Sequence, residues 1–328
     1  MYKQFYSLKR NPFEITPDPS FLYATKRHNE ALAALYYGVR RRKGFVVLTG
    51  EVGTGKTLLV RCLLEVLHRA NVSYAYVFNP RLTPTEFLQY IAGDLGLPAS
   101  GKNKTELLLD LSSYVIGRHQ KGLTTVLVVD EAHHLAPEVL EEVRLLTNLE
   151  TAKEKLLQIL LIGQQELEGK LDSTDLRQLK QRISLRAHLR PLELDETCGY
   201  MDCRLRLAGH ANPTELFPAD TSLEVHKQSR GFPRLINTIC ENALIHGYAA
   251  QSKIIAPSII REVADDFRLN VAQGLAPASA EPETHASEVQ RAAQTLLDLY
   301  AYLRNVQRLE PTLRMPLGTG TKTNEPYI

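Results

Sequence analysis

The sequence predicts an α/β fold, with a five-stranded parallel sheet between helices followed by a small all-helical domain. Short apolar runs alternate with helix-period patterns up to about residue 190, which is typical of parallel strands joined by crossover helices. From about Pro191 the strand signals end and only helical patterns continue. These two observations predict one sizeable sheet domain with a smaller helical attachment.

The expected elements follow one another in a simple order. The opening segment, to about Phe21, contains three prolines, which favours an extended arm over a domain surface. A helix is expected from about Lys26 to Arg42, because its apolar residues share one face. The five strands are expected near residues 45–49, 72–78, 124–129, 157–162 and 185–189. The helices of the second domain are expected near residues 195–209, 219–229, 233–250 and 256–268.

Composition sets wide limits on function. A formal net charge of +2 neither requires nor excludes nucleic acid, because a local basic face can exist within a balanced total. The four cysteines form no C-x-x-C pair, so neither a zinc site nor a disulfide framework is expected. No apolar stretch approaches the roughly 20 residues that span a bilayer, and the N-terminus lacks a signal-peptide core. We expect a cytoplasmic protein without a transmembrane segment, with a peripheral position at the inner membrane left open.

Residues 50–57 fit the phosphate-binding pattern G-x-x-x-x-G-K-[ST], between a strand-like run and a helix-like run. The glycines let backbone N–H groups turn toward phosphates, and the following helix presents its positive end to the same anion. Lys56 is expected to reach the outer phosphates, and the Thr57 hydroxyl to hold Mg²⁺. The loop does not distinguish ATP from GTP, and the alternative is a turn that binds nothing. The expected nucleotide-binding residues are Gly50, Glu51, Val52, Gly53, Thr54, Gly55, Lys56 and Thr57.

A buried strand over residues 125–129 ends in two carboxylates, Asp130 and Glu131. Asp130 is expected to accept Mg²⁺ or its water, and Glu131 to polarise the attacking water of a phosphoryl transfer. The alternative is that the pair only ends the strand and begins a loop.

Ala132 and His133 extend these carboxylates to the string Asp-Glu-Ala-His, which also marks a superfamily of helicases. We reject that interpretation because the chain has no room for a second motor domain after Pro191. For His133 and His134 we favour a surface or substrate-facing role over metal ligation.

Four further residues are candidates for contact with a terminal phosphate. Gln164 ends the strand near 157–162, where its amide reaches a phosphate or a water. Arg182 is the first candidate and Arg177 the second for an arginine finger presented to a neighbouring subunit, and an ordinary surface arginine is the alternative for both. Arg234 follows a proline in a first helical turn, which aims its side chain back toward the phosphates.

The basic run from Arg40 to Lys43 has two interpretations. It is a candidate nucleic-acid patch, but cations at a helix C-terminus also complement the helix macrodipole. We favour the second interpretation and keep the first open.

The order of these motifs resembles the AAA+ ATPases, and specifically the ExeA-like (general secretion pathway protein A) family, over about residues 1 to 268. The segments that carry the resemblance are Asn11-Pro12-Phe13, Thr16-Pro17-Asp18-Pro19, Phe21-Leu22-Tyr23, residues 43–57, Asp130-Glu131-Ala132-His133, Gly163-Gln164, Gln181-Arg182-Ile183 and Gly231-Phe232-Pro233-Arg234.

The resemblance implies ATP rather than GTP, Mg²⁺, and a nucleotide-driven ring or helical homo-oligomer. It implies that Gln164 is sensor one, Arg182 the finger and Arg234 sensor two, with the adenine near Phe13 and Tyr23. The implied parts are an N-terminal arm over residues 1–22, an ATPase core over 23–190, a helical lid over 191–270, and a linker, isolated helix and disordered tail over 271–328.

The resemblance also suggests two functions. Secretion members often continue into a transmembrane helix and a peptidoglycan-binding domain, whereas shorter members are associated with polysaccharide or pilus export. We therefore expect an ATP-hydrolysing switch that acts on a protein partner of an export or envelope system. The same core resembles TnsC- and TniB-type transposition regulators, so ATP-dependent DNA binding is the alternative. A third possibility is a scaffold whose tail helix, near residues 287–309, recruits a membrane or export protein.

Overall fold

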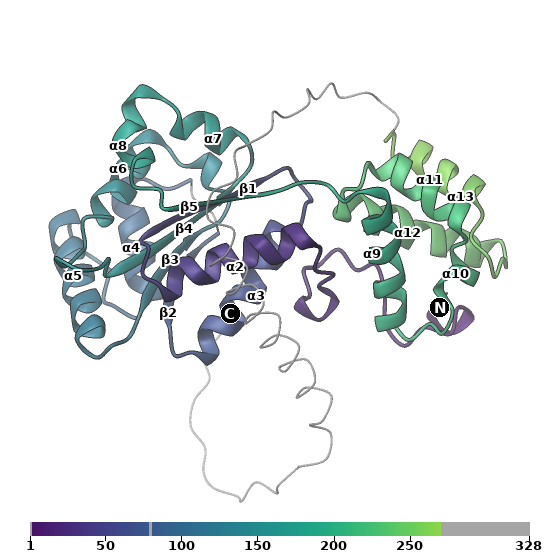
Figure 1. Cartoon of the computed structure of the whole chain (residues 1–328), viewed down its shortest axis with the longest axis horizontal. Helices are drawn as coiled ribbons and strands as arrows, with labels where there is room; N and C mark the ends of the chain where they lie inside the picture. Colours follow the sequence, from purple (N-terminus) through teal and green to yellow (C-terminus); the bar gives the residue numbers. More distant parts are fainter. Residues whose placement is uncertain (1, 79–80, 270–328) are drawn as a thin grey trace, which may run out of the picture.

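The computed structural model describes residues 2–78 and 81–269, and it contains a sheet domain joined by extended segments to a helical domain (Figure 1). All five strands of the sheet are parallel, in the order β2-β3-β4-β1-β5. The strands are β1 Phe45–Gly50, β2 Ser73–Val77, β3 Thr125–Val129, β4 Leu157–Gly163 and β5 Leu185–Leu189. The predicted α/β fold and its five strands are confirmed.

Helices cover both faces of the sheet, which is why its central strands are apolar along most of their length. On one face, α2 (Lys26–Arg40) and α3 (Lys56–Arg69) pack against one set of strand residues, including Val46 and Leu48. Alternate residues, such as Phe45 and Val47, face the opposite cluster. The helices that follow in the sheet domain are α4 Pro84–Asp94, α5 Lys104–Gln120, α6 Pro137–Leu146, α7 Glu166–Leu171 and α8 Arg177–Lys180.

Helix ends follow the local capping chemistry. The predicted capping box before α4 is present, with Thr83 and Glu86 each accepting from the other's backbone N–H and Pro84 in the first turn. The end predicted for α2 at Arg42 is two residues too late. The helix ends at Arg40, because Arg42 takes a left-handed conformation with φ 48° and Lys43 N donates to Gly38 O.

The helical domain, called the lid below, contains five helices in the described chain. They are α9 Leu194–Leu207, α10 Pro213–Leu216, α11 Ala219–Ser229, α12 Pro233–Ala249 and α13 Pro257–Asp266. Four of them match the predicted ranges, and the one-turn helix α10 was not predicted. The domain boundaries at residues 22, 190 and 270 remain predictions, and the parts predicted over 271–328 lie outside the described residues.

The N-terminal arm is not simply extended, as the prolines had suggested. It begins with a short helix, α1 (Tyr2–Phe5), which contacts α12 of the lid. The chain starts beside the lid (Figure 1), and Tyr6, Leu8 and Phe13 belong to the hydrophobic core of the lid. Phe13 is fully buried there and makes an edge-on ring contact with Phe217. Apolar side chains in the arm favour burial over an extended surface path. The ring of Phe13 thus belongs to the lid core, and the expectation that an adenine lies near it stays a prediction.

None of the helices in the described chain combines the length and apolar character that crossing a bilayer requires.

Candidate functional site

The loop between β1 and α3 encloses the ammonium group of its own lysine. Gly53 and Gly55 have φ of 83° and 99°, a region that other residues enter only with strain. Lys56 is buried, and its Nζ donates to the carbonyl oxygens of Gly50 and Glu51, at 2.8 Å each. Burial lowers the pKa of Lys56, and the nearby carboxylates oppose that shift. An ammonium group has three donors, so one N–H is left for an outer phosphate.

Thr57 lies at the start of α3 beside the carboxylate that follows β3. Its Oγ1 donates to Asp130 Oδ2 at 3.1 Å, and the Tyr76 hydroxyl donates to the same oxygen at 2.8 Å. Burial, and then Asp130 itself, raises the pKa of Tyr76, so Tyr76 stays a neutral donor. The predicted pair Thr57 and Asp130 is brought together, and Tyr76 is a site residue that the sequence analysis missed.

Glu131 and Gln164 meet through a histidine. Glu131 takes a left-handed conformation with φ 52°, rare for a residue with a side chain, and its Oε2 lies 3.4 Å from His133 Nδ1. His133 Nε2 lies 3.0 Å from Gln164 Nε2. Only 8% of His133 is exposed, so the predicted surface role for this residue is wrong. The short turn after Asp130 folds its ring inward, between the ends of β3 and β4.

The first turn of α12 in the lid contacts the phosphate loop directly. Arg234 N donates to Gly53 O at 3.2 Å, and a Cβ added at Gly53 would meet Arg234 Cβ at 2.9 Å. The turn before α12 is equally close to the interdomain segment, since a Cβ at Gly231 would lie 1.9 Å from Leu192 O. The lid and the loop therefore touch through backbone, and the exposed Arg234 side chain starts beside the loop. Its contact with the phosphates stays a prediction.

His28 contacts the backbone of the phosphate loop, and the sequence analysis did not predict this contact. Its Nε2 lies 3.3 Å from Thr54 O, and its Nδ1 lies 2.8 Å from Thr25 Oγ1 at the N-cap of α2. Burial lowers the pKa of His28. No motif marks this residue, because α2 and the loop are neighbours only after the sheet has formed.

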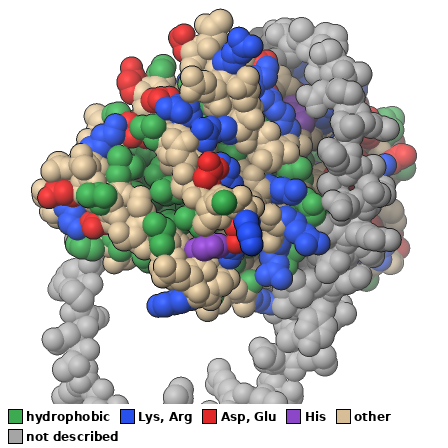
Figure 2. Space-filling model, turned by 60° about the vertical axis from the view of Figure 1, so that its left-hand side comes forward, with side chains coloured by type: hydrophobic (Ala, Val, Ile, Leu, Met, Phe, Trp, Pro, Cys, Tyr) green, Lys and Arg blue, Asp and Glu red, His purple; other side chains and the backbone are tan. Residues whose placement is uncertain are grey.

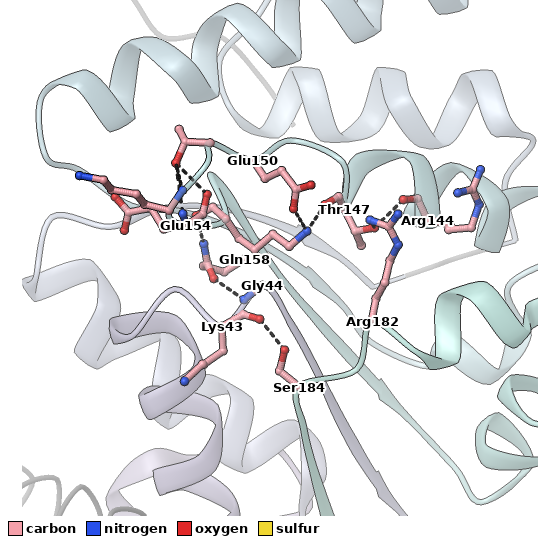
Figure 3. A network of polar contacts seen from close by, with 12 residues as sticks. Lys43, Gly44, Arg144, Thr147, Glu150, Glu154, Gln158, Arg182 and Ser184 are labelled. Carbon is pink, nitrogen blue, oxygen red and sulfur yellow. Dashed lines mark hydrogen bonds and ion pairs between the residues drawn. The ribbon is translucent and has the colours of Figure 1, made fainter.

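Arg182 lies near the amino-terminal ends of the parallel strands, whereas the phosphate loop follows the carboxyl end of β1. Arg182 precedes β5, and its Nη1 donates to Thr147 Oγ1 at 2.9 Å (Figure 3). At the same end of the sheet, Ser184 Oγ donates to Lys43 O at 2.6 Å and so connects the segments before β5 and β1. Arg177, the second candidate, begins α8 and is exposed. Arg182 is therefore away from the phosphate loop of its own chain. This position is compatible with a finger that acts on the nucleotide of a neighbouring copy.

The groups around the loop fit a nucleotide with Mg²⁺. Lys56 and the N-terminus of α3 suit phosphate oxygens, while the hydroxyl of Thr57 and the carboxylate of Asp130 are hard oxygen ligands. The described residues contain no group of three or more His, Cys, Asp or Glu arranged to hold a metal ion. One carboxylate together with substrate phosphates is the usual protein environment of Mg²⁺.

Comparisons with known proteins show what the chain is similar to. The model of the family described as "AAA domain" matches residues 39–171. General secretion pathway protein A of Aeromonas hydrophila is 47% identical over 253 residues, which are 77% of this chain and 46% of that protein. This chain thus spans about half the length of the curated relative it matches.

Solved structures of low sequence identity share the fold. The Aeropyrum pernix ORC2 protein, in ADPNP-ADP complexes, has a TM-score of 0.58 at 16% identity, covering 81% of this chain and 73% of that chain. Drosophila ORC bound to DNA has a TM-score of 0.59 at 18% identity, covering 94% and 83%. The fold, the motif order and the 47% identity place the chain in the AAA+ ATPases, as an ExeA-like member of that family.

Proposed function

We propose that this chain binds ATP with Mg²⁺, hydrolyses it, and acts as a nucleotide-dependent oligomeric switch in an export or secretion system. The observation that carries the proposal is the contact between Arg234 N and Gly53 O. Because the lid touches the loop that holds the phosphates, ATP and ADP favour different lid positions whenever they contact the loop differently. Such differential contacts are what a ligand-driven switch requires.

Each residue of the site has a role in this proposal. Lys56 and the amides at the start of α3 bind the phosphates, and Thr57 and Asp130 hold Mg²⁺, which neutralises charge on the phosphates. Glu131 accepts a hydrogen bond from the attacking water and takes its proton as the water oxygen bonds to phosphorus. Gln164 and Arg234 orient the terminal phosphate. Arg182 of a neighbouring copy stabilises charge on the phosphoryl group as the bond to ADP breaks.

The pathway part of the proposal draws on the relative. A role in export is supported by the name of General secretion pathway protein A, which is 47% identical over the shared region. We therefore propose a protein partner of an export or envelope system, a cytoplasmic location, and a peripheral position at the inner membrane if that partner is a membrane protein.

Two variants test the site. In Lys56→Ala, nucleotide binding measured with a fluorescent ATP analogue is expected to be lost. Glu131→Gln is expected to bind the analogue as the unchanged chain does and to release phosphate at least about 100-fold more slowly. Phosphate release by Glu131→Gln at the unchanged rate would remove Glu131 from the catalytic role, and normal binding by Lys56→Ala would remove the site.

DNA binding is a second candidate, favoured by exposed basic residues. Arg40, Arg41 and Lys43 are exposed at the end of α2, whereas Arg42 pairs with Glu154 at 3.1 Å. Lys and Arg side chains are also spread among acidic, apolar and other side chains over the face in Figure 2. Labelled duplex DNA titrated with Glu131→Gln, in ATP and in ADP across a salt series, tests this function. Saturable ATP-dependent binding with a steep salt slope supports it, and no binding in either nucleotide excludes it.

A further inference from the structure

The guanidinium of Arg182 is held by an element other than its own. Its Nη1 donates to Thr147 Oγ1 at 2.9 Å, and Thr147 is the residue that caps the C-terminal end of α6 (Figure 3). The C-terminus of a helix carries partial negative charge, so a cation is favoured at this position. A guanidinium has five N–H donors, and the contact with Thr147 uses one of them. Donors therefore remain for the phosphoryl oxygens of a nucleotide.

Thr147 is itself fixed by its surroundings. Only 4% of the residue is exposed, its Oγ1 donates to Arg144 O at 2.6 Å, and its carbonyl oxygen accepts from Lys155 Nζ at 3.0 Å. A hydroxyl has one donor and can also accept. Because the Thr147 O–H donates to a helix carbonyl, the same oxygen accepts from Arg182, and the direction of both hydrogen bonds is set.

The backbone of Arg182 is held on both sides. At the end of α8, Arg182 N donates to Leu179 O at 3.0 Å. Two residues later, Ser184 N donates to Phe45 O at 2.8 Å, which joins the segment to β1. With Thr147 at its tip, the Arg182 side chain is fixed at both ends. An arginine fixed in this way loses little conformational freedom when it contacts a ligand.

The nearby carboxylate of Glu150 is occupied by another cation. Lys155 Nζ donates to Glu150 Oε2, and this contact is the main cause that lowers the pKa of Glu150, with a smaller contribution in the same direction from the charge of Arg182. Within the described residues Glu150 pairs with Lys155, and Arg182 is in no ion pair. A hydroxyl thus orients the Arg182 guanidinium without neutralising its charge, as contact with a phosphate requires.

We propose that Thr147 is a positioning residue, which holds the Arg182 guanidinium in the arrangement that is presented to the nucleotide of a neighbouring copy. This inference rests on the hydrolysis and the finger proposed above. Thr147 touches neither nucleotide nor water in this arrangement, and it acts only through Arg182. Arg177, the other candidate for the finger, is exposed at the start of α8.

The test measures kcat, KM and nucleotide affinity in variants of the full chain. Thr147→Val keeps the shape of the side chain and removes the hydroxyl, and it is expected to lower kcat by about 10- to 100-fold with the affinity for a fluorescent ATP analogue unchanged. Thr147→Ser keeps the hydroxyl and is expected to retain most of kcat. Thr105→Val, at an exposed position of α5, is the matched control and is expected to leave kcat unchanged.

Two further measurements test whether Thr147 acts through Arg182. In an Arg182→Ala background, Thr147→Val is expected to lower kcat no further. When Thr147→Val is mixed with Glu131→Gln, phosphate release should exceed the sum of the separate rates. In the mixture, the unchanged Thr147 and Arg182 of one variant face the intact Glu131 of the other.

The contrary results are distinguishable. An unchanged kcat in Thr147→Val, a further decrease in the Arg182→Ala background, or no recovery in the mixture would overturn the inference while leaving the proposed hydrolysis intact. A melting temperature lowered in Thr147→Val and not in Thr147→Ser would make the hydroxyl structural and would also overturn it. Unchanged hydrolysis by Arg182→Ala would remove the finger and the inference with it. Absence of ATP hydrolysis by the unchanged chain would overturn the proposed function as well.

Discussion

The hydroxyl of Tyr76 donates to Oδ2 of Asp130 at 2.8 Å, the same carboxylate oxygen that accepts from Thr57 Oγ1 at 3.1 Å. The other oxygen, Oδ1, accepts from Glu131 N at 2.9 Å. Both oxygens of Asp130 are therefore oriented before any ligand binds. A carboxylate held in this way loses little freedom when it becomes a ligand or accepts from a bound water.

Tyr76→Phe removes the donor and keeps the ring. We expect the Mg²⁺ concentration needed for half-maximal nucleotide binding to rise about tenfold, because partners of a metal-holding carboxylate set its position. Binding of a fluorescent ATP analogue is measured across a Mg²⁺ titration and in EDTA, where Tyr76→Phe should match the unchanged chain. Tyr74→Phe, on the same face of β2, is the control. An identical Mg²⁺ dependence in all three proteins would show that Tyr76 does not orient the site.

His28 predicts an acid-dependent loss of stability. Burial lowers its pKa below the ordinary 6.5, so below that pH the unfolded chain binds a proton that the folded chain does not bind. The free energy of unfolding therefore falls as pH falls from about 6.5 toward the folded pKa. In His28→Gln this contribution is absent, and we expect a smaller decrease in stability between about pH 7.5 and 5.5.

Urea denaturation at several pH values, followed by circular dichroism, measures this difference. His133 and His210 also have pKa values lowered by burial, and they contribute equally to both proteins. His68→Gln, which removes an exposed histidine of α3, is the control. A parallel pH dependence of unfolding in His28→Gln and the unchanged chain would contradict the prediction.

The strands and the phosphate loop were predictable because local sequence determines them. A strand buried on both faces must be apolar throughout, and a loop that turns its amides inward requires glycine at positions such as Gly53 and Gly55. The contacts of Tyr76 and His28 were not predictable, because no local pattern encodes them. Tyr76 meets Asp130 only through the parallel register that pairs Val77 with Val129.

The errors have physical causes of the same kind. The prolines of the arm favoured an extended path, but its aromatic residues gain free energy when they are buried. Phe13 is fully buried in the lid, so the arm follows the lid core. For His133 a surface or substrate-facing role was expected, and the surface part of that expectation is wrong because the residue is buried. Its ring lies beside Glu131 and Gln164, which follow two different strands and meet only in the folded chain.

Arg204 predicts that the arm and the lid share stability. Its guanidinium is buried, donates from Nε to Pro12 O at 2.7 Å and from Nη1 to the Tyr200 hydroxyl at 2.7 Å, and lies 4.7 Å from the centre of the Phe21 ring. Arg204→Met keeps the stem but leaves these acceptors unpaired. We expect the free energy of unfolding to fall by about 2–4 kcal/mol in urea denaturation.

Arg206 on the same helix provides the matched control for this substitution. Its exposed side chain pairs with Asp202 at 2.7 Å, and water replaces such a partner readily. Arg206→Met is therefore expected to unfold at the same urea concentration as the unchanged chain. Equal effects of the two substitutions would mean that the buried contacts of Arg204 do not hold the arm.

Arg182 predicts that hydrolysis requires a neighbouring copy. The residue lies near the amino ends of the parallel strands, where Thr147 Oγ1 accepts from its Nη1. The phosphate loop lies at the carboxyl ends of the same strands. Arg182→Ala should therefore bind nucleotide normally while its phosphate release falls by about 10³-fold, the effect of removing an arginine finger.

Mixing two inactive variants separates a finger from an ordinary surface arginine. Arg182→Ala keeps Glu131 but offers no finger, whereas Glu131→Gln keeps the finger and cannot activate water. When the two are combined, an Arg182 from one variant faces the intact Glu131 of the other, so phosphate release should exceed the sum of the separate rates. Arg177→Ala, examined in the same mixtures, should hydrolyse ATP by itself. Recovery with Arg177→Ala and not with Arg182→Ala would reassign the finger to Arg177, and recovery with neither would remove the requirement for a neighbouring copy.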